Sequence, residues 1–238
     1  MDSSVQRLLE EEQKKEDARN QVTLKHLAAG VIFVDRKAVY IDETVEIGPG
    51  TTIWPGAILE GKTIIGKDCV IGPGCRIRDS IIDDGADLQN AVVTESSVGK
   101  NTKVGPFAYL RPGSKIGANA KVGDFVEVKN STLGDGSKAS HLTYIGDSDV
   151  GENVNLGCGV VFVNYDGSKK YRSVVGDGAF VGCNVNLVSP VNVGDGAYIA
   201  AGTTVTEDVP PGALCVGRQR QKHTDGWVEK RGILKKNK

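Results

Sequence analysis

Residues 98–128 read VGKNTKVGPFAYLRPGSKIGANAKVGDFVEV, and an aliphatic side chain returns at every sixth position of this stretch. Those positions are Val98, Val104, Leu110, Ile116, Val122 and Val128. The residue two places earlier is often small, as at Ala108 and Ala120. A hexapeptide period is typical of a parallel β-helix, whose triangular coil has three such faces. Each residue therefore lies above the one three repeats earlier, at about the 4.8 Å spacing of neighbouring strands.

The same period continues from Ile47 to Val205, with some five-residue steps that shorten single faces. One longer interruption, residues 164–172 (NYDGSKKYR), must leave the coil at a corner, because stacked faces admit no extra residues. Loops on rigid scaffolds often bind ligands, although this loop is also compatible with a tolerated surface insertion.

The segments outside the period have patterns of their own. Residues 5–29 have the thin apolar stripe of a helix that packs on a neighbour, and Gly30 stands where a C-cap is expected. The period stops at residues 210–212 (PPG), after which Lys and Arg predominate. We therefore predict an all-β fold with a parallel β-helix over residues 31–209, a linker-type helix over residues 1–30 and a basic tail over residues 210–238.

The composition argues against several kinds of partner and site. A net charge of −1 does not suit a general nucleic-acid surface. Residues 1–16 contain no apolar run for a signal peptide or membrane span, so we expect a cytoplasmic protein without a membrane partner. Five cysteines, an odd number, do not suit a disulfide framework, and Cys69 and Cys75 are expected to be buried thiols. No zinc-ligand spacing occurs, so no metal is expected.

A stack of coils leaves flat side faces exposed to water. Closed cyclic symmetry is the usual way in which identical chains cover such faces. Three triangular prisms pack naturally around a threefold axis, so we expect a homotrimer.

Two cations occupy one column of the predicted coil. Arg111 follows Leu110 and Lys129 follows Val128, one full coil apart. Like charges about 5 Å apart repel each other, and a phosphate group would relieve that repulsion. The alternative is a pair of solvated charges on an outer face.

A second column contains His141 followed by small residues. Counting coils upward from His141 reaches Cys158, then Cys183, then Ala201. Small residues over three coils leave a groove of roughly 15 Å, long enough for an extended arm such as pantetheine, and Arg218 beyond the last coil is placed to meet phosphates. The alternative is that small residues simply fit tight corners.

His141 is the candidate base of this column. Histidine titrates near neutral pH, which suits removal of a proton from an amine. A structural histidine is the alternative. Cys158 or Cys183 could instead accept an acyl group, but no second histidine lies within reach to activate either thiol, so direct transfer is favoured.

Five stretches carry a resemblance to a known family: residues 105–113 (GPFAYLRPG), 122–129 (VGDFVEVK), 141–147 (HLTYIGD), 164–167 (NYDG) and 200–204 (AAGTT). They resemble the acetyltransferase domain of the bifunctional N-acetylglucosamine-1-phosphate uridyltransferase/glucosamine-1-phosphate acetyltransferase family. The resemblance covers nearly the whole chain, including the helix before Gly30. The nucleotidyltransferase domain of the family has no counterpart here, so uridyl transfer is not expected of this chain.

The resemblance implies a left-handed β-helix that forms a trimer, with active sites between subunits and His141 as the general base. It implies a glucosamine 1-phosphate site at Arg111, Lys129, Tyr144, Asn155 and Lys170. It implies an acetyl-CoA site at Cys158, Asn164, Tyr165, Cys183, Ala201 and Arg218. Two residues depart from the family pattern, because Cys183 stands where many members have Ser and Asp124, one coil below His141, stands where Asn is usual.

The expected reaction is transfer of the acetyl group of acetyl-CoA to the 2-amino group of glucosamine 1-phosphate. The product, N-acetylglucosamine 1-phosphate, would serve UDP-N-acetylglucosamine and cell-wall precursor synthesis. One alternative is a non-catalytic trimeric scaffold. Another is a β-helix zinc enzyme of the carbonic-anhydrase type, which would need three histidines, whereas only His141 lies within the coils.

Overall fold

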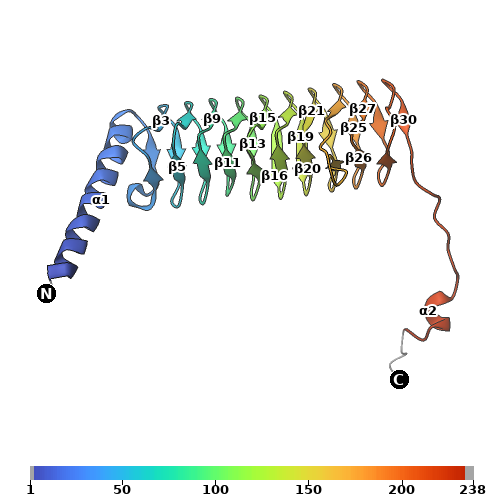
Figure 1. Cartoon of the computed structure of the whole chain (residues 1–238), viewed down its shortest axis with the longest axis horizontal. Coiled ribbons are helices and arrows are strands. Elements are labelled where there is room, and N and C mark those ends of the chain that lie inside the picture. The colour runs from blue at the N-terminus through green and yellow to red at the C-terminus, as the bar shows by residue number, and fades with distance from the viewer. Residues whose placement is uncertain (1–2, 234–238) are drawn as a thin grey trace.

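A prism of stacked coils occupies most of the computed structural model, which describes residues 3–233 (Figure 1). Its three faces are parallel sheets of eleven, ten and nine strands, here called sheets A, B and C. Consecutive strands pass from one face to the next, so each strand pairs with strands one coil away. The left-handed parallel β-helix predicted from the hexapeptide period and the family resemblance is confirmed.

The strands are two to four residues long. Sheet A contains β1 (Ile32–Phe33), β4 (Thr52–Ile53), β7 (Val70–Ile71), β10 (Asp87–Leu88), β13 (Lys103–Val104), β16 (Lys121–Asp124), β19 (Lys138–His141), β22 (Asn155–Leu156), β25 (Phe180–Val181), β28 (Tyr198–Ile199) and β30 (Leu214–Cys215).

Sheet B contains β2 (Tyr40–Ile41), β5 (Ile58–Glu60), β8 (Arg76–Arg78), β11 (Val92–Thr94), β14 (Tyr109–Leu110), β17 (Glu127–Lys129), β20 (Tyr144–Gly146), β23 (Val161–Val163), β26 (Asn186–Val188) and β29 (Thr204–Val205). Sheet C contains β3 (Glu46–Ile47), β6 (Ile64–Ile65), β9 (Ile81–Ile82), β12 (Ser97–Val98), β15 (Lys115–Ile116), β18 (Thr132–Leu133), β21 (Ser148–Val150), β24 (Ser173–Val175) and β27 (Asn192–Val193).

The aliphatic period forms the core of the prism. Leu110 pairs with Val128, and Val128 pairs with Ile145, each one coil above the last and each fully buried. The small residue two places earlier fills the corner. Thr102, at such a corner, donates its hydroxyl to the Gly117 carbonyl at 2.7 Å and accepts the Ala120 N–H at 3.0 Å, which satisfies backbone groups that the turn exposes.

The predicted first helix is confirmed as α1 (Ser3–Ala28), followed by Gly30 at φ 90° and a 3₁₀ turn, Arg36–Ala38. Only its last turns contact the first coil, where Val22 and His26 are buried, and the rest projects from the end of the prism (Figure 1). Arg36 joins the helix to the coil by donating to the Thr23 hydroxyl at 2.9 Å.

Strand pairing continues past residue 209, where the hexapeptide period ends. Strand β30 pairs with β28, and Val209 forms an isolated bridge to Val193. Gly217 and Arg218 still bond to the last coil, and after them the chain leaves the prism as an extended segment that leads to a short helix, α2 (Trp227–Lys230) (Figure 1). The last basic residues of the predicted tail, Lys235, Lys236 and Lys238, lie outside the described residues.

Two further predictions concern thiols and membranes. Cys69 and Cys75 are buried as predicted, and all five cysteines are free thiols. Between residues 3 and 233, no helix is both long enough and apolar enough to cross a bilayer.

Candidate active site

The predicted vertical alignment of His141 with small residues is confirmed. His141 ends β19, and pairing of Ala139 with Leu156 places Cys158 one coil above it. Pairing of Leu156 with Val181 and of Val181 with Ile199 then adds Cys183 and Ala201. The column therefore runs along the corner between sheets A and B.

Backbone hydrogen bonds lock the turns of this column to one another. The Asn184 N–H donates to the Cys158 carbonyl at 2.8 Å, and the Gly202 N–H donates to the Cys183 carbonyl at 2.8 Å. Cys183 is exposed and Cys158 is half-buried. Above them, Arg218 donates from Nη1 to the Ala201 carbonyl at 3.1 Å, so its guanidinium group lies at the last coil of the column.

His141 faces solvent rather than the interior, with 53% of its side chain exposed. Its Nδ1 lies 2.7 Å from Oδ1 of Asp124, which ends β16 and pairs with it one coil below. Gly123 permits this close stacking, because a Cβ there would lie 1.9 Å from the Ser140 carbonyl oxygen. Thr143 donates its hydroxyl to the His141 carbonyl at 2.8 Å, which fixes the turn that follows.

A cationic cluster lies farther along sheet B. The predicted column of Arg111 and Lys129 is confirmed, because Leu110 pairs with Val128. Lys170 of the loop after β23 lies beside them, and it is the main reason why the pKa of Lys129 is lowered; desolvation and the Arg111 charge add to this effect. A lysine with a depressed pKa between other cations suits an anionic ligand.

Two carboxylates accompany the cluster, and the sequence analysis missed both. Glu127 Oε1 accepts from Arg111 Nη1 at 2.7 Å, and Asp147 Oδ2 lies 3.8 Å from Lys129 Nζ. Glu127 was detectable, because it precedes Lys129 by two positions and so shares the outward face of β17. The two cations are thus partly compensated rather than wholly unpaired.

Asp147 holds a buried polar network together. Asn130 donates to its Oδ1 at 2.7 Å, and Asn164, only 6% exposed, donates to Oδ2. Burial opposes ionisation of Asp147, but these hydrogen bonds and the nearby lysines outweigh it and hold its pKa below the usual range. Asn164 also donates to the Tyr144 hydroxyl at 3.5 Å, which connects the network to the outer face of β20.

The loop at residues 164–172 projects from a corner, as predicted, and has a fixed shape. Asp166 accepts the Ser168 and Lys169 N–H groups, each at 2.7 Å, and these bonds lower its pKa to about 2. Arg172 forms a two-pronged ion pair with Asp149 of β21. The loop therefore presents Lys170 toward Lys129 from a braced position.

The structure brings together most, but not all, of the predicted site residues. Arg111, Lys129, Tyr144, Asn164 and Lys170 gather on sheet B. His141 lies at the near corner, three residues before Tyr144. The column residues Cys158, Cys183, Ala201 and Arg218 continue along that corner. Asn155 stands apart from both groups, and Tyr165 borders the cluster.

Asn155 begins β22 on sheet A, where it pairs with Lys138 and Phe180. Tyr165 is 55% exposed, and its hydroxyl donates to the Gly167 carbonyl of its own loop at 2.6 Å. Tyr165 also forms an antiparallel β-bridge with Lys170 and so borders the cationic cluster. Within residues 3–233, no hydrogen bond or ion pair joins Asn155 to that cluster. Their roles stay predictions.

A cavity at the start of the prism lies apart from the predicted site. A cavity of about 730 Å³ lies between α1 and the first coil, lined by residues that include Arg19 and Tyr40, and none of its lining residues is a predicted site residue. No group of three or more His, Cys, Asp or Glu side chains in residues 3–233 is arranged to hold a metal ion. His141 itself stands on an open face of the chain, with about half of its side chain exposed.

Comparison with known proteins identifies relatives of the coils. Residues 36–114 match the model of the GMPPB C-terminal domain, and residues 172–207 match that of the bacterial transferase hexapeptide (six repeats). A solved structure of LpxA, a UDP-N-acetylglucosamine acyltransferase from Bacteroides fragilis, superposes with a TM-score of 0.59 at 17% identity, over 74% of this chain and 69% of that one. This likeness bears on the fold alone.

Closer relatives are proteins named bifunctional protein GlmU. The chain is 56% identical over 220 residues to the one from Acetivibrio thermocellus, covering 92% of this chain and 48% of that protein. It is 55% identical over 213 residues to the one from Caldanaerobacter subterraneus, covering 90% of this chain and 47% of that protein. The chain thus spans about half the length of these curated relatives. Over that half, the chain is similar to the bifunctional GlmU proteins.

Proposed function

We propose that the chain is an N-acetyltransferase that moves the acetyl group of acetyl-CoA to the 2-amino group of glucosamine 1-phosphate. The observation that supports this most directly is the column on the corner between sheets A and B. It sets a solvent-facing histidine at the foot of three coils of small residues and an arginine, Arg218, at the top. Similarity to the GlmU proteins over about half of their length favours the same reaction class.

The cationic cluster is suited to the sugar phosphate. Lys129 and Lys170 would bind the phosphate oxygens, and Arg111, held by Glu127, would add a charge with a fixed orientation. Tyr144 lies between this cluster and His141, where its hydroxyl can contact the sugar ring. The amino group of a sugar anchored in this way would lie on the His141 side of sheet B.

The column is suited to an extended thiol carrier. Cys158, Cys183 and Ala201 have short side chains at one corner position, so a pantetheine arm could lie along them. Arg218 at the end of the column would contact phosphate groups of the carrier. Asn164 and Tyr165, at the corner beyond β23, would lie near the transferred acetyl group.

His141 would act as the general base. It would take a proton from the ammonium form of the substrate, and the freed amine would attack the thioester carbonyl. The C–N bond forms, the C–S bond breaks, the second proton of the nitrogen passes to water, and the proton on the imidazolium can return to the thiolate that leaves. No residue of the chain becomes acylated in this scheme.

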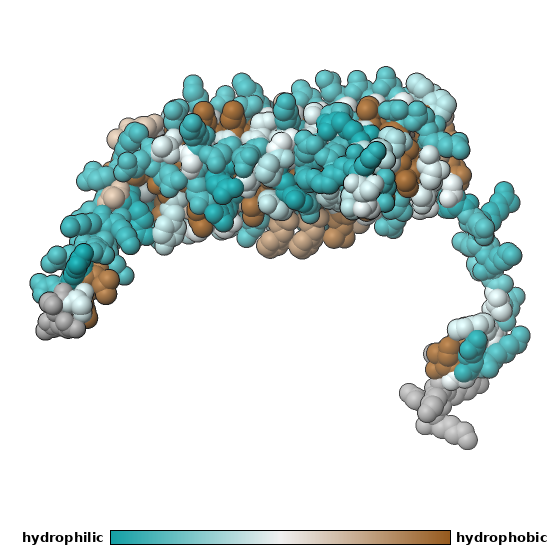
Figure 2. Space-filling view, in the orientation of Figure 1, coloured by the Kyte–Doolittle hydropathy of each residue, from teal (hydrophilic) through white to brown (hydrophobic). Residues whose placement is uncertain are grey.

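We further propose that the chain works as a homotrimer with sites between subunits. Phe107, Phe125 and Leu142 occupy neighbouring corner positions beside Asp124 and His141, and each is more than half exposed. The two phenyl rings stack with centroids 5.5 Å apart. Figure 2 shows an apolar patch along the lower edge of the middle coils. Such a ridge in water favours burial against a second copy, which would also enclose the open site.

The test is an acetyl-transfer assay with purified protein. Acetyl-CoA and glucosamine 1-phosphate are expected to give free coenzyme A and an equal amount of N-acetylated sugar phosphate, identified by mass spectrometry. Absence of both products from a folded, correctly assembled protein would contradict the proposal and favour a non-catalytic scaffold.

A further inference from the structure

The contact between Asp124 and His141 suggests a role for a residue outside the substrate-binding set. Both side chains lie on the outer surface, where an aspartate usually faces water. The carboxylate instead meets the edge of the imidazole ring, with Oδ1 2.7 Å from Nδ1. This distance is that of a strong, charge-assisted hydrogen bond.

The backbone around the pair leaves it little freedom. The Leu142 N–H donates to the Asp124 carbonyl at 2.9 Å, directly beside the side-chain contact. The bare α-carbon of Gly123 allows β16 and β19 to approach closely at this point. The strands are therefore held in the register that aligns the carboxylate with the ring.

Charge decides which ring nitrogen holds the proton. The backbone N–H of Asp124 and then the His141 side chain hold the pKa of the carboxyl below its usual range, so it is ionised at neutral pH. An ionised carboxylate only accepts hydrogen bonds, so it selects the form of the imidazole that is protonated at Nδ1. The lone pair of the neutral ring is then on Nε2.

The two ring nitrogens point in nearly opposite directions. Since Nδ1 faces Asp124 in the coil below, Nε2 faces away from that coil, toward the side of the column on which Cys158 lies. A general base needs its free lone pair on the side where the substrate binds. The carboxylate would also stabilise the imidazolium that forms when the proton is taken up, as an aspartate does in a Ser–His–Asp triad.

We propose that Asp124 is a positioning residue for catalysis: it holds the His141 ring in the Nδ1-protonated form and directs Nε2 toward the amine of the sugar substrate. This inference rests on the proposed acetyl transfer for its consequence in rate. The part concerning the ring itself is independent of activity. Asp124 does not contact the cationic cluster, so the proposal concerns turnover rather than sugar-phosphate affinity.

The kinetic test compares Asp124→Ala, which removes the acceptor, with Asp124→Asn, which keeps an acceptor and removes the charge. We expect Asp124→Ala to lower kcat by about 10- to 100-fold, a part of the 10²–10⁴ that general bases supply. Asp124→Asn should retain more activity than Asp124→Ala, with both KM values close to those of the unaltered protein. Asp87→Asn is the control, because Asp87 lies on sheet A and contacts Gln89 rather than His141.

The structural readout is ¹⁵N NMR of the His141 ring, which distinguishes protonation at Nδ1 from protonation at Nε2. The unaltered protein should show the Nδ1–H form and Asp124→Ala a shift toward Nε2–H, at a pH where the ring is neutral. A His141 ring protonated mainly at Nε2 in the unaltered protein would overturn the proposal. So would an Asp124→Ala variant that folds, assembles and turns over normally.

The two readouts separate this inference from the proposed function. If the unaltered protein transfers no acetyl group, the proposed function fails, and with it the kinetic role of Asp124. The NMR comparison still decides whether Asp124 sets the ring form. Melting temperature and oligomeric state of each variant, compared with those of Asp87→Asn, identify any loss of activity that comes from misfolding.

Discussion

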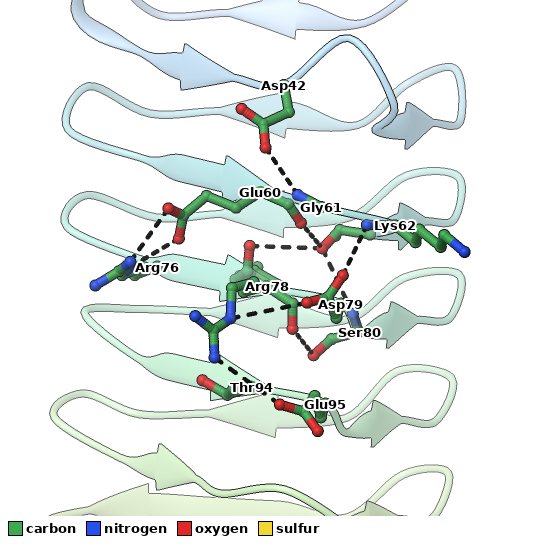
Figure 3. Close-up of polar contacts among 12 residues, drawn as sticks. Asp42, Glu60, Gly61, Lys62, Arg76, Arg78, Asp79, Ser80, Thr94 and Glu95 are labelled. Atoms are coloured by element: carbon green, nitrogen blue, oxygen red, sulfur yellow. Dashed lines mark hydrogen bonds and ion pairs between the residues drawn. The ribbon is translucent and has the colours of Figure 1, made fainter.

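Charged side chains are arranged differently in the early and the middle coils of sheet B. In the early coils opposite charges alternate: Glu60 binds Arg76 through two bonds of 2.7 and 3.1 Å, and Arg78 lies within 3.8 Å of both Asp79 and Glu95 (Figure 3). In the middle coils the equivalent positions hold Arg111 and Lys129. Glu127 and Asp147 compensate these two cations in part, but Lys170 adds a third cation beside Lys129.

The difference shows that the fold accepts both oppositely charged and like-charged neighbours at the same position of sheet B. Glu60 pairs with Arg78 one coil above, just as Arg111 aligns with Lys129, so the same position accepts either arrangement. The paired acidic and basic side chains of the early coils neutralise each other without a bound anion. The crowded cations lower the pKa of Lys129, which is a cost that an anionic ligand would remove. The middle coils are therefore the place to seek the substrate phosphate.

The largest expected effect lies in the middle coils. His141→Ala should lose activity by a factor on the order of 10²–10⁴, because it removes the only candidate base of the column. The fold should survive, because the side chain is mostly exposed. Coenzyme A release is the measurement, and near-normal turnover in this variant would remove His141 from the mechanism.

The next effect is on substrate affinity. Arg111→Ala should raise the KM for glucosamine 1-phosphate by about 10- to 100-fold, since hydrogen bonds to charged groups are worth about 1.5–3 kcal/mol. The KM for acetyl-CoA should change far less. Arg78→Ala, at the equivalent position of an early coil, is the matched control and should leave both constants unaltered. Equal increases in the sugar-phosphate KM for Arg111→Ala and Arg78→Ala would contradict the distinction between the middle and the early coils.

A smaller effect is expected in the pH dependence. Because neighbouring cations lower the pKa of Lys129, its ammonium form is lost at a lower pH than that of an ordinary lysine. The KM for the sugar phosphate should therefore begin to rise at correspondingly lower pH. Lys170→Met removes the largest cause, which raises the pKa of Lys129 and should move this onset to higher pH, whatever its effect on affinity. Measurement of KM from neutral to alkaline pH checks the sign; an onset that stays in place or moves downward would contradict it.

The smallest effect is expected in the early coils. Arg76→Ala breaks an exposed ion pair, and such pairs contribute about 0–1 kcal/mol to stability. Thermal unfolding should therefore shift slightly, and acetyl transfer should be unaffected. Loss of activity in this variant would show that charge in the early coils also serves the reaction.

Counting residues along the repeat was the most reliable way to predict from the sequence which side chains stack on neighbouring coils. The strict period predicted that His141, Cys158, Cys183 and Ala201 are aligned. The loop at residues 164–172 does not disturb this alignment, because an insertion at a corner leaves the coils above it in register. The same arithmetic placed Asp124 below His141. Long-range contacts were predictable here because each follows from a local repeat.

Contacts that depend on loop shape or on side-chain reach were not predictable in this way. Lys170 reaches Lys129 through the path of the loop at residues 164–172, which has no repeat. The bonds from Asn130 and Asn164 to Asp147, by contrast, join residues that each stand two places after a stacked core residue, so the repeat could have predicted them. The last strand, β30, lies beyond Pro210 and Pro211, where the period is broken although Leu214–Cys215 still pairs. Asn155 lies on sheet A, so its predicted role in sugar binding depends on the proposed site between subunits.

The most direct test of the account is the ratio of kcat/KM for glucosamine 1-phosphate to that for unphosphorylated glucosamine, measured in the unaltered protein and in Lys129→Ala. The account predicts a large ratio in the unaltered protein, which falls in the variant because the phosphate loses one of its cationic ligands in the middle coils. A ratio near one in the unaltered protein, or a ratio unchanged by the substitution, would contradict it.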